Sequence, residues 1–171
     1  MKNEEKILFN ATVCLPVRGD EVLLAMKTRK IGAMCWNGYG GGIEEGENAI
    51  TGVIRELQEE SGLIATPDDL EKMAIVDFYN EKSDGSTYIC RVHFFLLKNW
   101  EGELIETEEM ITPTFFKIND LPFDKMMPAD REYFPYILNK KKVYVKSYYS
   151  PFQKELKRKV EIKEVEELSE N

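Results

Sequence analysis

The stretch GGIEEGENAITGVIRELQEESGL, residues 41–63, decides the fold, because it joins a glycine-rich loop to a strongly patterned helix. Residues 48–61 carry the apolar spacing of an amphipathic helix, and Gly62 suits the left-handed position just past a helix end. At about 100° per residue, an acidic arc lies beside an apolar stripe on this helix. The arc holds Glu56, Glu59 and Glu60, and the stripe holds Ile50, Val53, Ile54 and Leu57.

The acidic arc is unfavourable for the helix taken alone. Like charges three and four residues apart cost roughly 0.2–0.5 kcal/mol per pair, and anions in the last turns oppose the helix dipole. One interpretation is a solvated charged face. The other is a site for a hard divalent cation such as Mg²⁺, which prefers carboxylate and carbonyl oxygens and would offset the repulsion.

Length and composition predict one domain spanning residues 1–171, with a charged hairpin or tail over about 150–171. The net charge of −8 argues against nucleic-acid polymers and anionic membranes as partners, since these attract basic patches. The three cysteines are widely spaced and suggest neither a disulfide framework nor a zinc site, so a reducing, cytoplasmic location is expected. No run of residues has the apolar length of a signal peptide or a membrane span.

The coarse pattern predicts a mixed α+β class. The segment 68–72 is read as a turn or short helix, and the end of the chain as a terminal hairpin, because Val and Ile alternate there. The predicted strands are 7–17, 22–26, 73–80, 87–97, 114–118, 143–149 and 156–162; the predicted helices are 48–61 and 129–138, and 28–42 is a glycine-rich loop.

The frame around the acidic arc resembles the Nudix box, G-x5-E-x7-R-E-U-x-E-E-x-G-U with U aliphatic. Such a resemblance implies a mixed β-sheet sandwiched between helices, with a loop–helix–loop motif. It also implies hydrolysis of a nucleoside diphosphate linked to another group, with Mg²⁺ or Mn²⁺ as cofactor. The matching positions are Gly41, Glu47, Arg55, Glu56, Leu57, Glu59, Glu60, Gly62 and Leu63.

The resemblance also implies roles for the box residues. Arg55 would pair with Glu47 and fix the helix to its loop. The general base would be Glu56 first and Glu60 second, while Glu44 and Glu45 are read as solvated loop charges. A further acid is expected from the loop 105–110, with Glu109 preferred to Glu108. The expected metal ligands are Glu56, Glu59, Glu60, Glu109 and the backbone carbonyl of Gly40.

The segments VLLAMKTRKIGAMCWNGYGGGIEEGE (22–47), ELQEESGL (56–63) and PFDKMMPADREYFP (122–135) are similar to the MutT-like branch of animal-type 8-oxo-dGTP diphosphatases. This resemblance implies a nucleotide-pool sanitation hydrolase linked to DNA repair. We also expect the protein to be a monomer that acts on a free nucleotide. This branch has a W-P-D-D loop, where the present chain has Met127-Pro128-Ala129-Asp130, so one base-reading carboxyl is missing. Strict selectivity for 8-oxoguanine is therefore not expected. The substrate-binding residues implied by the resemblance are Thr12, Lys27, Asn37, Met127 and Asp130, with Tyr39 able either to approach the substrate or to pack.

Two other functions stay open at this point. Tyr79 lies at the spacing past the box that is typical of Nudix hydrolases of dinucleoside polyphosphates. A Nudix-fold module that binds a nucleotide without cleaving it is the third possibility, although such modules typically lose box glutamates and this chain keeps all of them.

Overall fold

The computed structural model describes residues 8–169, so residue 7 of the first predicted strand lies outside the described residues. The elements alternate between sheet strands and two α-helices, with three short 3-10 turns. In chain order they are β1 (Asn10–Arg18), β2 (Glu21–Lys27), β3 (Trp36–Asn37), β4 (Tyr39–Gly42), α1 (Ala49–Ser61), β5 (Leu63–Ile64), η1 (Pro67–Asp69), β6 (Leu70–Glu81), β7 (Thr87–Leu97), β8 (Glu101–Gly102), β9 (Met110–Lys117), η2 (Phe123–Lys125), α2 (Asp130–Leu138), β10 (Lys142–Tyr149), η3 (Pro151–Gln153) and β11 (Glu161–Val165).

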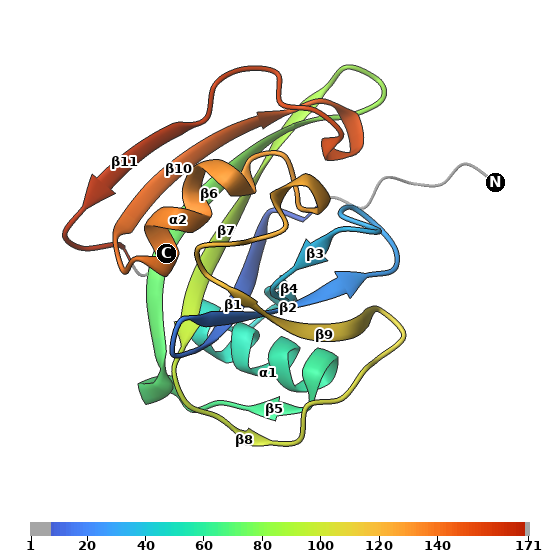
Figure 1. Ribbon diagram of the computed structural model, residues 1–171. Coiled ribbons are helices and arrows are strands. Elements are labelled where there is room, and N and C mark those ends of the chain that lie inside the picture. The colour runs from blue at the N-terminus through green and yellow to red at the C-terminus, as the bar shows by residue number, and fades with distance from the viewer. Residues whose placement is uncertain (1–7, 170–171) are drawn as a thin grey trace.

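Nine of these strands form one mixed sheet within the described residues. Its main path runs β11-β10-β6-β7-β1-β2-β3, while β4 pairs with β1 and β9 pairs with β2. The pairs β1–β7 and β10–β6 are parallel, and the other pairs are antiparallel. The predicted mixed sheet is therefore confirmed, and the strands β5 and β8 form a separate small pair under α1 (Figure 1).

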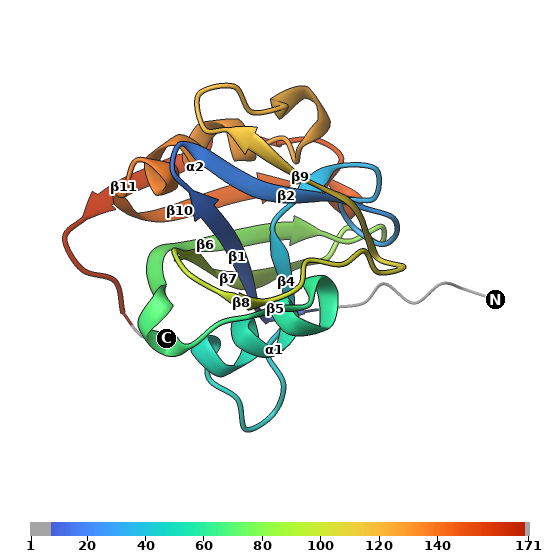
Figure 2. The ribbon, with the colours of Figure 1, turned by 60° about the horizontal axis from the view of Figure 1, so that its bottom comes forward.

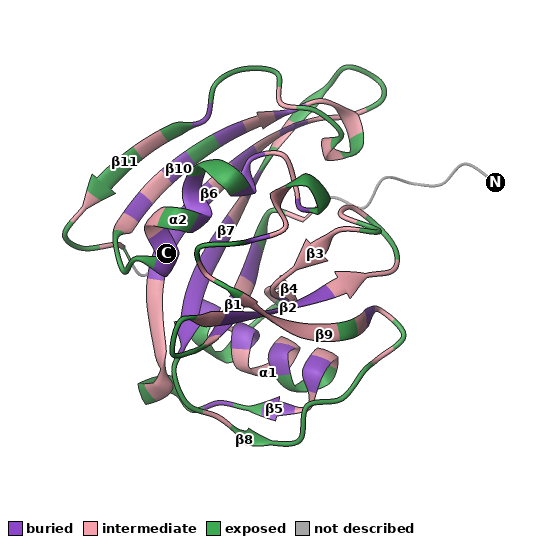
Figure 3. Ribbon diagram, in the orientation of Figure 1, coloured by how far each residue is buried: buried purple, intermediate pink, exposed green. Residues whose placement is uncertain are grey.

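The sheet lies between the two helices, with α1 and α2 on opposite sides (Figure 2). Each side has its own apolar core, because successive residues of a strand point to opposite faces. In β7, Phe94 and Leu96 join the core beneath α2, whereas Phe95 and Leu97 join the core beneath α1. Figure 3 shows the result as buried central strands and a mostly exposed outer strand β11.

Helix α1 begins and ends where local chemistry predicts. The Asn48 side chain accepts from the Thr51 backbone N–H at 2.9 Å, and the Thr51 hydroxyl accepts from the Asn48 N–H at 3.1 Å, which closes a capping box. At the other end Gly62 takes φ +78 and donates to Gln58. Val53 and Leu57 are buried as expected, but Ile50 is exposed and Ile54 only half-buried, so the docked stripe is narrower than the sequence predicts.

The remaining expectations differ mainly at element ends. The predicted loop 28–42 contains the short strands β3 and β4, and the segment 68–72 is a 3-10 turn followed by the start of β6. The terminal hairpin is confirmed, but its second strand is β11 at Glu161–Val165, later than the predicted 156–162. Among residues 8–169 no helix is both long and apolar enough to cross a membrane.

Candidate active site

Arg55 connects helix α1 to the glycine-rich loop through hydrogen bonds. Its Nε and Nη2 atoms donate to the two carboxylate oxygens of Glu47 at 2.8 and 2.9 Å, and Nη2 also donates to the Gly42 carbonyl at 3.1 Å. This bidentate bond lowers the pKa of Glu47 to about 2. The Arg55–Glu47 pair expected from the box is therefore present.

The same guanidinium also reaches back along its own helix. Arg55 Nη1 donates to Glu56 at 3.0 Å and to Glu59 at 3.3 Å, contacts that the sequence analysis did not foresee. These ion pairs offset the repulsion between the neighbouring carboxylates.

Glu60 is held apart from this network and packs against the loop. Its Oε1 accepts from the Gly40 backbone N–H at 2.8 Å. Burial, followed by the nearby charge of Glu56, raises the pKa of Glu60 to about 8. Burial also raises the pKa of Glu56, against the opposing effect of Arg55. The two carboxyl groups are thus under electrostatic strain that a divalent cation would relieve.

The glycines of β4 make this close approach possible. A Cβ on Gly41 would lie 2.7 Å from the Glu56 carboxylate, and a Cβ on Gly40 would collide with the backbone of Thr12 in β1. Side chains are therefore excluded from both positions, and the loop backbone lies directly against the helix carboxylates.

Glu109 lies on the loop before β9 and is held by the two basic residues that follow β2. It accepts from Arg29 Nε at 3.0 Å and forms an ion pair with Lys30 at 3.6 Å, and the contact with Arg29 lowers its pKa. Its charge is close enough to raise the pKa of both Glu56 and Glu60. The structure therefore brings Glu109 into the electrostatic range of the box, although its carboxylate faces Arg29.

The metal-ligand set is not assembled in this arrangement. Within residues 8–169, no three His, Cys, Asp or Glu side chains converge as they would around a metal ion. Each relevant carboxylate instead bonds to a protein donor: Glu56 and Glu59 to Arg55, Glu60 to Gly40, and Glu109 to Arg29. The donor set still fits a hard divalent cation, because it consists of carboxylate oxygens on adjacent helix turns with a backbone strand against them.

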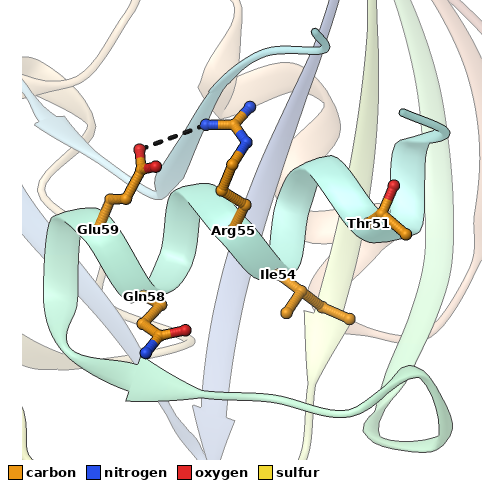
Figure 4. A pocket seen from close by; sticks show the side chains of 5 residues that line it. All are labelled: Thr51, Ile54, Arg55, Gln58 and Glu59. Atoms are coloured by element: carbon orange, nitrogen blue, oxygen red, sulfur yellow. Dashed lines mark hydrogen bonds and ion pairs between the residues drawn. The ribbon is translucent and has the colours of Figure 1, made fainter. Parts of the chain in front are cut away.

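Two hollows adjoin the box helix. One is an open depression on the outer side of α1, lined by Thr51, Ile54, Arg55, Gln58 and Glu59 (Figure 4). It lacks Glu56 and Glu60, the two carboxylates that lie against the glycine-rich loop. The other, about 220 Å³, is the site of interest, because it collects residues from both ends of the expected active site: Thr12, Lys27, Asn37, Gly40, Gly41, Glu60, Met127 and Asp130.

The end of this cavity where the base is expected contains polar groups that are fixed by hydrogen bonds. Asn37 donates from Nδ2 to the carbonyls of Cys35 at 2.9 Å and Gly32 at 3.3 Å, which leaves its Oδ1 as the acceptor for a ligand. A Cβ on Gly32 would lie 3.5 Å from the sulfur of Met127, so the amide of Asn37 and the thioether of Met127 flank the same loop.

Asp130 is the ionisable group of this end. It is only 5% exposed, and its carboxylate accepts from Tyr133 Oη at 3.1 Å and from the Met127 N–H at 3.2 Å. Burial raises its pKa to about 7, so near neutral pH it exists as both acid and carboxylate. The neighbouring Ala129 is buried in the core beneath α2 and does not line the cavity.

Thr12 and Lys27 lie along the wall between the two ends. The Thr12 hydroxyl is buried and has no hydrogen-bond partner among the described residues, which marks it as a group awaiting a ligand. Burial lowers the pKa of Lys27, while the charge of Glu60 opposes this effect.

Two tyrosines named from the sequence do not face the cavity. Tyr39 is fully buried in the core beneath α1, and its hydroxyl has no partner among the described residues, an arrangement that corresponds to the packing alternative. Strand β4 alternates its faces, and Tyr39 points to the helix side. Tyr79 stacks on Tyr148 at 4.6 Å between ring centroids and does not line the cavity.

Several lining residues were missed because they come from remote strands and carry no local motif. The cavity walls include apolar side chains of β6 and β7 and an amide pair formed by Asn80 and Gln153. The residues not foreseen are Leu8, Ala11, Val13, Ile31, Gly38, Phe78, Asn80, Tyr88, Cys90, Val92, Phe94, Met110, Tyr133, Phe134 and Gln153.

A family model described as the NUDIX domain matches residues 8–137, which contain the whole loop–helix–loop described above. This chain belongs to the Nudix hydrolase family. The oxidized purine nucleoside triphosphate hydrolase of Danio rerio is 42% identical over 131 residues, which are 77% of this chain and 80% of that protein. The protein of the same description from Mus musculus is 40% identical with the same coverage.

The fold agrees with solved structures of the family. The crystal structure of the MutT protein from Bacillus halodurans has a TM-score of 0.77 and 25% sequence identity, and covers 91% of this chain and 97% of that one. Nudix hydrolases generally work with a divalent metal ion, and the oxygen-rich donor set on α1 fits that requirement.

Proposed function

We propose that this Nudix hydrolase cleaves a purine nucleoside triphosphate to the monophosphate and pyrophosphate, with Mg²⁺ as the cofactor and Mn²⁺ as an alternative. Oxidised purines such as 8-oxo-dGTP are the expected substrates, which makes nucleotide-pool sanitation the biological role. The observation that carries the proposal is one continuous cavity that joins Glu60 and the β4 glycines to Asn37, Asp130 and the unpartnered Thr12 hydroxyl.

The base end supports a purine with both donors and acceptors on its edge. Asn37 offers an acceptor, Thr12 offers a hydroxyl, and Asp130 offers either a donor or an acceptor, depending on its protonation. Met127 can cover the ring with a polarisable thioether. Because position 129 contributes no carboxyl, we expect discrimination between bases to be weaker by roughly 10- to 1000-fold than in a site with two such readers.

The phosphate end supports hydrolysis. When bound there, a divalent cation would supply shielding of the triphosphate charge and activation of a water. Glu56, Glu59 and Glu60 would hold it with the Gly40 carbonyl and Glu109, while the Arg55–Glu47 pair keeps the helix and loop in register. Glu56 is our first choice of general base and Glu60 the second, and burial raises the pKa of both, as proton acceptance near neutral pH requires.

Turnover of a nucleotide panel tests the proposal. The purified protein with Mg²⁺ is assayed on dGTP, 8-oxo-dGTP, 2-hydroxy-dATP, dATP, dCTP, dTTP, ADP-ribose and diadenosine tetraphosphate, with products separated by ion exchange. We expect a purine triphosphate to be the best substrate and to yield monophosphate and pyrophosphate. A best substrate among the dinucleoside polyphosphates would contradict the proposal, and binding of nucleotides without any turnover would indicate a non-catalytic module.

The oligomeric state, the location and the partners belong to the same proposal. We propose that the protein works as a monomer in the cytoplasm on a free nucleotide, with neither a nucleic-acid polymer nor a membrane as partner, in accord with its net charge of −8. Light scattering coupled to gel filtration tests the oligomeric state, and a mass of two chains would contradict it.

A further inference from the structure

The turn η3, Pro151–Gln153, brings a side chain from the C-terminal part of the chain into the nucleotide cavity. Gln153 lines the cavity although it lies outside the residues 8–137 that the family model matches. Figure 1 shows the turn at the end of β10, curling back beside the loop that joins β6 to β7. The wall of the cavity therefore depends on a segment with no motif of its own.

The backbone of this turn is unusual. Phe152 and Gln153 are consecutive non-glycine residues in the left-handed region, with φ of +61 and +56. Such conformations are unfavourable for residues with a side chain and persist where surrounding contacts impose them, often at ligand sites. The contacts here include the Gln153 N–H bond to Ser150 at 3.0 Å and the Ser150 N–H bond to Glu155 at 2.9 Å.

The segment 154–158, which follows η3, makes further contacts with the sheet. Lys157 forms an ion pair with Glu81 of β6 at 2.6 Å, and its N–H donates to the Tyr148 carbonyl at 2.7 Å. The Arg158 guanidinium lies 3.7 Å from the centre of the Tyr148 ring. These contacts hold the turn in place, so the position of Gln153 does not depend on its own side chain.

A chain of hydrogen bonds fixes the orientation of the Gln153 amide. The Phe78 carbonyl can only accept, so the buried Asn80 must present Nδ2 to it, at 3.3 Å. The Oδ1 atom of Asn80 then faces Gln153 and accepts from its Nε2 at 2.9 Å. The Gln153 Oε1 atom remains, and it accepts no hydrogen bond from the residues that the structure describes. The backbone of β6 thus sets which atom of Gln153 is available to a ligand.

We propose that Gln153 is a specificity-determining residue that accepts a hydrogen bond from an N–H donor on the base edge of the bound nucleotide. This inference rests on the proposed function, since it assumes that the cavity takes a purine nucleotide. The favoured ligand has an exocyclic amino group, because that group provides a donor at the periphery of the ring. Asn80 acts as a positioning residue, since it orients the Gln153 amide and is itself committed to Phe78 and Gln153.

The test pairs bases that differ only in an amino group. Turnover with Mg²⁺ is measured for dGTP against dITP, and for dATP against the triphosphate of 2′-deoxypurine riboside. Equilibrium binding of the corresponding α,β-methylene triphosphates gives a readout that does not require catalysis. Gln153→Met removes the amide with little change of length, and Gln153→Gly removes it while relaxing the left-handed backbone. Phe152→Gly is the matched control, because Phe152 has the same backbone conformation but is exposed and does not line the cavity.

We expect the wild type to prefer the amino-bearing base of at least one pair by about 5- to 20-fold, a range typical of a lost hydrogen bond. Gln153→Met and Gln153→Gly should reduce this ratio to within about twofold, through KM and analogue affinity and with kcat largely kept, while Phe152→Gly preserves it. Thermal melting confirms that each variant is folded.

Three results would overturn the inference. A wild type that turns over purine triphosphates but treats both members of each pair alike would exclude an amino-group contact. Unchanged ratios in both Gln153 variants would exclude Gln153 as the reader and leave the proposed function standing. Neither turnover nor binding of any nucleotide by the wild type would remove the proposed function together with this inference.

Discussion

Replacing Glu60 with glutamine should make the metal-free protein more stable while removing its response to metal. Glu60 has its pKa raised from 4.5 to about 8, with burial as the largest cause. A carboxyl whose pKa is raised on folding stabilises the protein below the unfolded pKa, and this contribution is lost as pH rises through the folded pKa. Ionising Glu60 thus weakens the fold across the range from about pH 4.5 to pH 8.

The two pKa values set the size of the effect. Linkage between 4.5 and about 8 gives a loss of about 3 kcal/mol at pH 7 relative to acidic pH, as an upper bound. Glutamine carries no charge, and its Oε1 can still accept from the Gly40 N–H. We therefore expect Glu60→Gln to raise the free energy of unfolding by about 1–3 kcal/mol at pH 7 in EDTA, or the melting temperature by roughly 3–10 °C.

The assay is thermal melting of wild type and variant from pH 5 to pH 8, with EDTA or with Mg²⁺. The difference between the proteins should be smallest at pH 5 and grow with pH, and Mg²⁺ should raise the melting temperature of the wild type alone. Glu59→Gln is the matched control, because the Glu59 side chain is 59% exposed and its replacement should leave metal-free stability nearly unchanged. A Glu60→Gln variant that melts below the wild type in EDTA at pH 8 would refute the reasoning.

Three further substitutions test other parts of the site. Asp130→Asn should be more stable than the wild type above pH 7 and equally stable below about pH 4, because the raised pKa of Asp130 makes its ionisation costly. Urea titrations across pH measure this difference, and a reversed trend would show that the buried carboxylate is stabilising. Gly41→Ala should lower kcat by about 100-fold or more with the fold kept, since its methyl group would displace the Glu56 carboxylate. Steady-state kinetics measure kcat and circular dichroism checks the fold; a near-normal kcat would mean that the loop need not lie against the helix. Tyr39→Phe should leave KM unchanged and stabilise the protein by up to about 1 kcal/mol, because the lost hydroxyl is buried without a partner; a large rise in KM would restore Tyr39 to the substrate site.

Local chemistry made the helix α1 predictable from the sequence. The Asn48 cap, the apolar spacing and Gly62 act within a few residues of one another, and the structure begins and ends the helix at these signals. Strands β3 and β4 were not predicted, because β3 has only two residues, β4 is mostly glycine, which is depleted in strands, and their pairing with β2 and β1 is a tertiary contact.

The site was predictable to the extent that its residues share one motif. The pairing of Arg55 with Glu47 followed from the resemblance, whereas the ion pairs of Arg55 with Glu56 and Glu59 depend on which carboxylates lack another partner. The contact between Asn80 and Gln153 joins strand β6 to the turn η3 over 73 positions of the chain, so no local pattern could indicate it.

The charge distribution implies that nucleotide binding depends on a divalent cation. The chain has a net charge of −8, and the basic residues nearest the box are already engaged: Arg55 with Glu47, and Arg29 and Lys30 with Glu109. A triphosphate approaching the cavity therefore meets carboxylates, while the basic residues nearest the box are already paired with them. The partly buried Lys27 lines the cavity and is the exception. Coulomb repulsion opposes that encounter until a divalent cation occupies the helix carboxylates or arrives bound to the nucleotide. Nucleotide affinity should consequently rise steeply with Mg²⁺ concentration, and in EDTA it should rise slightly with added monovalent salt, which screens the repulsion.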